Sequence, residues 1–166
     1  MNNSLPIIFP VTYRCNLSCS YCREYKKKDI TDINKSIEMI KSMSNEWVYL
    51  TGGEPLILDE IYNICNALKL AGKKVGLTTN GTIHKFGIVS YVDRLGISLD
   101  GPKDINDLTR GEGSFDKSIK FLEKVAGKTE VGIMCTVGNW NENRLNEIEE
   151  IGKQYKCDFI QFSDVN

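Results

Sequence analysis

Three cysteines near the start of the chain, Cys15, Cys19 and Cys22, have the residue type and the spacing for metal chemistry. Thiolates are soft ligands, and closely spaced cysteines on a loop hold iron–sulfur clusters. The spacing Cys-x3-Cys-x2-Cys supplies three ligands, which leaves one iron of a four-iron cubane without a protein ligand. An electron-transfer site normally closes this fourth position, whereas an open iron can bind a substrate or a cofactor. The pattern therefore favours a 4Fe–4S cluster with one open iron.

Two other roles are possible for these cysteines. A structural zinc needs four ligands, usually as two separated pairs. The only histidine, His84, has no Cys-x2-Cys partner nearby, and the remaining cysteines stand singly, at Cys65, Cys135 and Cys157. The even count of six also permits disulfides. No apolar secretory segment begins the sequence, so we expect a reducing cytoplasm, which disfavours them. The cluster is favoured, with zinc and disulfides as the alternatives.

The composition indicates an ordinary globular protein, since 41% of the 166 residues are hydrophobic and 26% are charged. Lys and Arg number 21 against 22 Asp and Glu, which gives a net charge of −1. This balance gives no electrostatic reason to expect nucleic acid as a partner. No apolar run approaches the roughly 18 residues of a membrane-spanning helix, so we expect no membrane segment.

The elements that must position the cysteines alternate between strand and helix patterns. Apolar, β-rich runs predict strands at 7–12, 47–50, 74–79, 95–99, 131–137 and 158–162. Helical spacing of apolar residues predicts helices at 33–43, 59–70, 115–125 and 143–155, with a short helix and a turn over 83–92.

This alternation indicates parallel βαβ units. A complete barrel of eight such units takes about 250 residues, or about 31 for each unit, so this length supplies about five and a half units. We therefore predict a single domain over residues 1–166. Its fold is an α/β partial (β/α)6 TIM-type barrel, with a parallel six-stranded sheet that is open at one edge.

The chemically suggestive segments follow the predicted strands. The cysteine loop follows the first strand, Gly52-Gly53-Glu54-Pro55 the second, Asn80-Gly81 the third and Asp100-Gly101-Pro102 the fourth. A single glycine-rich turn is usually only a turn. Active sites of parallel α/β barrels, however, lie at the carboxyl ends of the strands. The shared location of these segments at one rim is the stronger observation.

The cysteine loop together with Thr51-Gly52-Gly53-Glu54-Pro55 resembles the radical S-adenosylmethionine (SAM) enzymes, and the resemblance covers nearly the whole chain. In that family the open iron of a 4Fe–4S cluster binds the amino and carboxylate groups of SAM. The resemblance implies that Gly52, Gly53 and Glu54 receive the SAM ammonium. Glycine suits such a position because it permits a close approach of backbone to ligand that a β-carbon would block.

The resemblance implies four further contacts with SAM. Tyr21 corresponds to the family's aromatic position beside the adenine, and Asn80 lies near the ribose. Ser98 corresponds to a residue that hydrogen-bonds the ribose or the carboxylate. Arg110 corresponds to an arginine that pairs with the carboxylate through its planar donor fork. Met134 departs from relatives that carry a polar residue at this place in the fifth strand.

The same residues have structural interpretations. Asn80 and Ser98 could cap strand ends, and Arg110 could form a surface ion pair. We interpret Asp100 as a residue that turns the chain before Pro102, and Cys135 as a small buried hydrophobic residue of the fifth strand. No catalytic side chain is assigned.

The resemblance implies a mechanism in which the reduced cluster cleaves SAM to a 5′-deoxyadenosyl radical, which abstracts hydrogen from a substrate. Such an enzyme is oxygen-sensitive and needs a reductant such as flavodoxin or ferredoxin. The alternatives are a degenerate scaffold that binds SAM and the cluster, and an iron–sulfur electron carrier without radical chemistry.

The combination of Leu99-Asp100-Gly101-Pro102 with Arg110-Gly111 and Gly113-Ser114-Phe115 looks most like the branch that modifies peptides and proteins. Members of that branch usually carry a C-terminal cysteine-rich extension for extra clusters, and only nine residues follow Cys157 here. We expect a peptide or protein substrate, and a partner subunit or the substrate itself over the open barrel edge.

Overall fold

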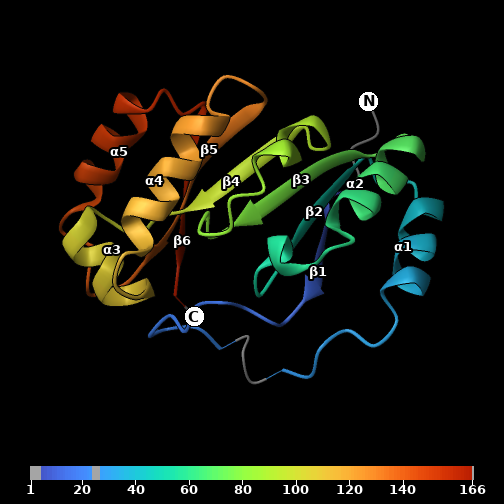
Figure 1. Cartoon of the computed structure of the whole chain (residues 1–166), viewed down its shortest axis with the longest axis horizontal. Helices are drawn as coiled ribbons and strands as arrows, with labels where there is room; N and C mark the ends of the chain where they lie inside the picture. Colours follow the sequence, from blue (N-terminus) through green and yellow to red (C-terminus); the bar gives the residue numbers. More distant parts are fainter. Residues whose placement is uncertain (1–4, 24–26, 166) are drawn as a thin grey trace.

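The computed structural model describes residues 5–23 and 27–165, and its centre is one parallel sheet (Figure 1). The strands follow each other in the order β1-β2-β3-β4-β5-β6, and each neighbouring pair is parallel. Their bounds are β1 Ile7–Thr12, β2 Trp47–Gly52, β3 Lys74–Thr79, β4 Arg94–Ser98, β5 Glu130–Val137 and β6 Phe159–Asp164. The predicted partial barrel, open between its first and last strands, is confirmed.

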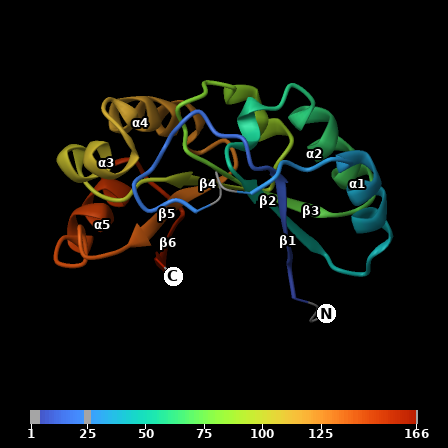
Figure 2. The same cartoon turned by 90° about the horizontal axis from the view of Figure 1, so that it is seen from below.

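The helices lie along the convex side of the curved sheet (Figure 2). The α-helices are α1 Ile33–Ser42, α2 Ile61–Leu70, α3 Lys103–Arg110, α4 Ser114–Val125 and α5 Leu145–Gln154, and the 3₁₀ helices are η2 Pro55–Ile57 and η3 Phe86–Ser90. Helix α1 begins after Asp32, whose carboxylate caps the N–H of Lys35 at 2.9 Å. The segment predicted as a short helix over 83–92 contains only the 3₁₀ turn η3.

Helix α3 has no counterpart in the sequence prediction. Its buried residues include Asn106, Thr109 and Arg110, whereas Leu108 is 75% exposed. The usual apolar stripe of a helix is therefore replaced by polar residues that face inward, and hydrophobic periodicity does not reveal it. This inward polar face is the first indication that α3 serves a site rather than the core.

The core lies between the convex face of the sheet and the helices. Val48 and Leu50 of β2 are fully buried, as are Leu95 and Ile97 of β4. They belong to one apolar cluster with residues of α2 and α4, among them Leu68, Phe121 and Leu122. Burial of each such side chain contributes about 1.5–3 kcal/mol. Cys135 is 2% exposed within this cluster, as the sequence predicted.

On the concave face, two glycines stand beside large side chains of the neighbouring strand. A β-carbon at Gly96 would stand 2.5 Å from Cγ of Met134, and one at Gly132 would stand 2.5 Å from Cγ of Phe159. The glycines thus make room for Met134 and Phe159 over the sheet. Arg94 forms an ion pair with Glu130 on this face. None of the helices in the described part of the chain is long and apolar enough to cross a membrane.

Candidate active site

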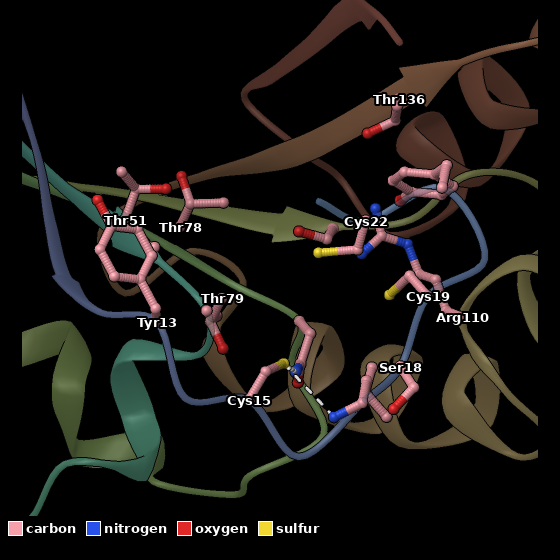
Figure 3. A pocket seen from close by; sticks show the side chains of 16 residues that line it. Tyr13, Cys15, Ser18, Cys19, Cys22, Thr51, Thr78, Thr79, Arg110 and Thr136 are labelled. Atoms are coloured by element: carbon pink, nitrogen blue, oxygen red, sulfur yellow. Dashed lines mark hydrogen bonds between the residues drawn. The ribbon is translucent and has the colours of Figure 1, made fainter. Parts of the chain in front are cut away.

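A pocket of about 200 Å³ lies at the carboxyl ends of the strands (Figure 3). All three cysteines of the Cys-x3-Cys-x2-Cys motif line it. Four consecutive strands each contribute a hydroxyl side chain to its wall, namely Thr51, Thr78, Ser98 and Thr136. The sequence-predicted residues that also line it are Tyr21, Gly52, Gly53, Asn80 and Arg110. Only Glu54 of the predicted set is not among the lining residues.

The cluster loop follows β1, and its described residues are 13–23 and 27–28, the latter directly before Asp29. The Asp29 carboxylate accepts hydrogen bonds from the hydroxyl of Thr12 and the N–H of Tyr13, each at 2.8 Å. It also pairs with Arg14 at 3.0 Å. The N–H of Tyr13 is the main reason that the pKa of Asp29 lies below its ordinary value. Asp29 therefore holds the C-terminal end of the loop against its start at Thr12–Arg14.

The three thiols surround the pocket rather than meeting at one point. Cys15 lies apart from Cys19 and Cys22, which lie near Arg110 (Figure 3). Within residues 5–23 and 27–165, no three His, Cys, Asp or Glu side chains are close enough to share one metal ion. A cubane needs no such convergence, because each thiolate binds a different iron. The donor set therefore fits a four-iron cluster better than a single zinc.

The thiols are free and partly shielded from water. All six cysteines are unpaired, which disagrees with a disulfide framework. Burial raises the pKa of Cys15, which accepts the N–H of Leu17 at 3.4 Å. Burial also raises the pKa of Cys19, against the opposing effect of the Arg110 charge.

Gly52 and Gly53 bring the end of β2 against the cluster loop. The N–H of Gly53 donates to the carbonyl of Thr12 at 2.7 Å, and the N–H of Glu54 donates to that of Arg14 at 2.9 Å. A β-carbon at Gly53 would stand 2.1 Å from the Arg14 carbonyl oxygen. Gly52 has a φ of 120°, which side chains disfavour. The close approach that the sequence predicted for a ligand is thus made here by the loop backbone itself.

Glu54 lies beneath the pocket with its carboxylate fully enclosed. It accepts the N–H of Asn80 at 2.7 Å, the hydroxyl of Thr79 at 2.8 Å and the N–H of Leu56 at 2.9 Å. Burial raises the pKa of Glu54 in spite of these donors. The structure thus gives Glu54 a role in joining the ends of β2 and β3, and its contact with the SAM ammonium stays a prediction.

Asn80 connects β3 with the cluster loop. Its Nδ2 donates to Oδ1 of Asn16 at 3.0 Å and approaches Sγ of Cys15 at 3.8 Å. Its Oδ1 accepts the N–H of Thr82 at 2.9 Å, so the strand-end interpretation holds in part. Ser98 lines the pocket at the end of β4. The contact of Asn80 and Ser98 with a ribose stays a prediction.

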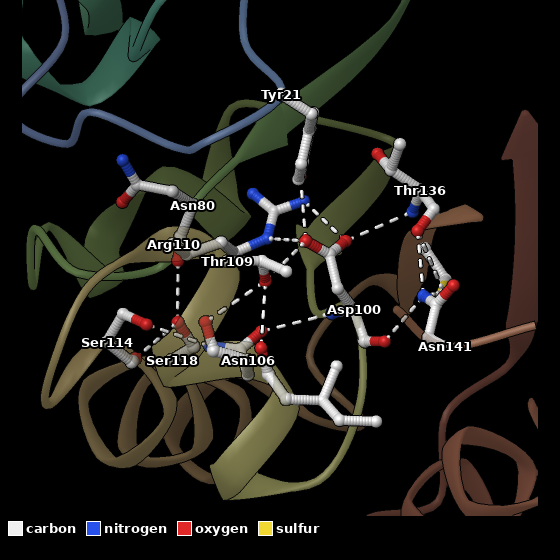
Figure 4. Close-up of polar contacts among 12 residues, drawn as sticks. Tyr21, Asn80, Asp100, Asn106, Thr109, Arg110, Ser114, Ser118, Thr136 and Asn141 are labelled. Carbon is white, nitrogen blue, oxygen red and sulfur yellow. Dashed lines mark hydrogen bonds and ion pairs between the residues drawn. The ribbon is translucent and has the colours of Figure 1, made fainter. Parts of the chain in front are cut away.

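Asp100 lies at the centre of a network of polar contacts beside the pocket (Figure 4). Its fully buried carboxylate accepts hydrogen bonds from Nε and Nη2 of Arg110, both at 2.8 Å. The same carboxylate accepts the hydroxyls of Tyr21 at 2.7 Å and Thr109 at 3.2 Å, and the N–H of Thr136 at 3.1 Å. The interpretation of Asp100 as a turn residue is therefore incomplete. Arg110 forms an ion pair as considered, but the pair is buried rather than superficial.

Tyr21 contacts two planar groups. Its ring stacks on Trp140 with centroids 5.0 Å apart and planes 9° from parallel. The guanidinium carbon of Arg110 lies 5.7 Å from the centroid of the same ring. Burial raises the pKa of Tyr21, so its hydroxyl stays a donor to Asp100. Trp140, on the loop after β5, was not singled out by the sequence because its partner is distant in the chain.

The model of the Radical SAM superfamily matches residues 9–152 of this chain. The chain belongs to the Radical SAM superfamily. Mycofactocin maturase MftC of Mycolicibacterium smegmatis is 30% identical over 167 residues, which cover 90% of this chain and 42% of that protein. Fe-coproporphyrin III synthase of Methanosarcina barkeri is 26% identical and matches 94% of this chain and 43% of its own length. This radical SAM chain thus spans less than half the length of these relatives.

Solved radical SAM structures share the fold. Streptococcus suis SuiB bound to S-adenosylmethionine superposes with a TM-score of 0.82 at 20% identity, over 98% of this chain and 41% of that one. A structure of anSMEcpe with bound AdoMet gives a TM-score of 0.78 at 26% identity, over 96% and 50% of the two chains. The resemblance inferred from the cysteine loop and the Gly-Gly-Glu-Pro segment is confirmed at the level of the superfamily.

Proposed function

We propose that the chain holds a 4Fe–4S cluster through Cys15, Cys19 and Cys22, binds SAM beside it, and generates a radical that abstracts hydrogen from a peptide substrate. The observation that carries the proposal is that all three cysteines and Gly52-Gly53 line one pocket at the strand ends. When bound, the cluster supplies one electron, and SAM supplies the organic radical. The side chains described above bind, orient and shield these groups.

The pocket residues fit such cofactors by their chemistry. The three thiols supply soft ligands, and the Arg110 charge opposes the rise that burial causes in the pKa of Cys19. Arg110 offers a cation, and the hydroxyls of Thr51, Thr78 and Ser98 offer donors and acceptors for a polar ligand. Tyr21 supplies an aromatic wall. We assign the SAM carboxylate to Arg110, the ribose to Ser98 and Asn80, the ammonium to the segment 52–54, and the adenine to Tyr21.

A peptide is the substrate class that the relatives favour. SuiB has been solved with its precursor peptide SuiA, and anSMEcpe with a Kp18Cys peptide. The sheet is not closed between β1 and β6, and an open barrel edge is consistent with a substrate as large as a peptide. We place the enzyme in the cytoplasm, where thiols stay reduced, with flavodoxin or ferredoxin as the reductant.

The test is SAM cleavage under anaerobic conditions. The reconstituted chain is reduced with dithionite and given SAM, and 5′-deoxyadenosine is measured by mass spectrometry. We expect about four irons per chain and slow product formation without substrate. A variant with Cys15, Cys19 and Cys22 changed to alanine should lose both. The matched control changes Cys65, Cys135 and Cys157 to alanine, and should keep both because these cysteines lie outside the pocket. Iron without 5′-deoxyadenosine would favour the electron carrier or scaffold instead.

A further inference from the structure

The buried ion pair of Asp100 and Arg110 joins the elements around the pocket. Asp100 follows β4, Arg110 ends α3, Tyr21 belongs to the cluster loop and Thr136 belongs to β5. All three of the other residues donate to the Asp100 carboxylate. One carboxylate therefore fixes a strand end, a helix end and the cluster loop relative to each other (Figure 4).

The remaining polar groups of Asp100 extend this network. Its N–H donates to Oδ1 of Asn106 at 3.0 Å, and its carbonyl accepts Nδ2 of Asn141 at 2.7 Å. The N–H of Ser20 in the cluster loop also donates to the carbonyl of Thr109 at 2.8 Å. The polar buried face of α3 is thus explained, because it is built to hold Asp100 and the cluster loop together.

The geometry of Arg110 leaves one part of its guanidinium for a ligand. Nε and Nη2 form a two-point contact with the Asp100 carboxylate, which fixes the plane of the group. Arg110 lines the pocket, and its Nη1 is the nitrogen that this two-point contact does not use. A buried guanidinium without a fixed partner would have several orientations, whereas this one has a single direction.

We propose that Asp100 is a positioning residue for SAM binding: it orients Arg110 so that Nη1 meets the SAM carboxylate. This inference rests on the proposed function, because it assumes SAM as the ligand of the pocket. It assigns to Asp100 no contact with SAM and no proton transfer.

The main test compares two ligands on the Asp100→Asn variant. Asparagine keeps the size of the side chain but loses the charge and one acceptor. Calorimetry on the reconstituted protein measures the affinity for SAM and for decarboxylated SAM, which lacks the carboxylate. We expect a Kd for SAM that rises about 10-fold or more, and a Kd for decarboxylated SAM that changes less than about 3-fold. Iron content should stay at the wild-type level.

The matched control is Asp93→Asn. Asp93 also accepts a backbone N–H, that of Val75 at 2.7 Å, and also pairs with a cation, Lys69. It precedes β4, whereas Asp100 follows it, so the two carboxylates lie at opposite ends of the sheet. This variant should bind SAM as the wild type does.

A double-mutant cycle separates positioning from general damage. If Asp100 acts through Arg110, the variant Arg110→Gln removes most of the SAM affinity, and Asp100→Asn adds little to it. Should Asp100→Asn fail to fold, Thr109→Val replaces it. This variant removes one donor to Asp100 and changes no residue of the pocket wall. We expect it to raise the Kd for SAM about 2- to 5-fold without affecting decarboxylated SAM.

Three results would overturn the role of Asp100. They are an unchanged or lowered Kd for SAM in Asp100→Asn, an equal loss for both ligands, and additive losses in the cycle with Arg110→Gln. For Thr109→Val, an unchanged Kd for SAM or an equal loss for both ligands has the same consequence. An unaltered chain that takes up iron but binds no SAM would instead overturn the proposed function, so the two failures are distinguishable.

Discussion

The Glu54 carboxylate at the end of β2 accepts the backbone N–H of Asn80 at the end of β3, at 2.7 Å. The hydroxyl of Thr79 and the N–H of Leu56 complete its partners. Gly53, which precedes Glu54 in the chain, and Asn80, which donates to it, both line the pocket. A fully buried carboxylate in this place sets the spacing of two strand ends, and through them the position of the cluster loop.

The first prediction concerns pH. In the unfolded chain Glu54 titrates near its ordinary pKa of 4.5, and burial raises its pKa in the folded chain. Between these two values the folded state binds more protons, so the contribution of Glu54 to stability falls as the pH rises above 4.5. Urea unfolding of wild type and Glu54→Gln across this range checks the sign. The variant should lose this part of the pH dependence.

The same variant should be less stable overall. Both oxygens of the Glu54 carboxylate accept hydrogen bonds, whereas the amide of glutamine has only one oxygen. Its NH2 group would therefore face an N–H or O–H donor and leave it unpaired. Leaving such a group unpaired costs about 1–3 kcal/mol. A Glu54→Gln chain with wild-type stability and an unchanged pH profile would show that the carboxylate does not join the strand ends in solution.

The second prediction concerns Gly53. A methyl group at this position meets the Arg14 carbonyl oxygen at 2.1 Å, so the base of the cluster loop must move. We expect Gly53→Ala to lower both the iron content after reconstitution and the affinity for SAM. The control is Gly87→Ala, whose β-carbon would have Tyr62 as its nearest neighbour at 3.8 Å. Full iron content in Gly53→Ala, measured by colorimetric assay, would contradict the tight contact.

Local patterns predicted the fold and the cysteines, whereas long-range contacts were beyond them. The strands follow from alternating residues such as Val48 and Leu50, and the metal donors follow from spacing on one short loop. The role of Asp100 depends on Tyr21, which is 79 positions away in the chain. In the sequence, Gly101-Pro102 after Asp100 indicates only a turn. Helix α3 escaped prediction because its buried face is polar.

The third prediction uses the two tryptophans of the chain. Trp140 stacks on Tyr21, which directly precedes Cys22, whereas Trp47 stacks on Tyr49 in β2. An iron–sulfur cluster absorbs in the range where tryptophan emits, so the nearer ring loses more fluorescence. Cluster assembly should strongly quench the fluorescence of Trp47→Phe, which keeps Trp140. It should only weakly quench that of Trp140→Phe, which keeps Trp47. Equal quenching in both variants would contradict the position of Trp140 beside the cluster loop.

The last prediction concerns the open edge of the barrel. Within the described residues β6 pairs only with β5, and its last four residues, 161–164, are exposed. β4 has a neighbour on each side, β3 and β5. Unpaired strand edges are exposed to water and to other chains. We therefore expect amides of β6 to exchange hydrogen faster than those of β4, by about 10-fold or more, as measured by mass spectrometry on the isolated chain.

A covering partner should remove this difference in exchange rate. If a subunit or a peptide substrate docks along β6, protection should rise over Phe159–Asp164 and stay unchanged over Arg94–Ser98, which is already enclosed. Equal protection of both strands in the isolated chain would mean that the edge is already covered. Size-exclusion chromatography under the same conditions would then distinguish a second copy of the chain, which doubles the mass, from a rearrangement within one copy, which does not.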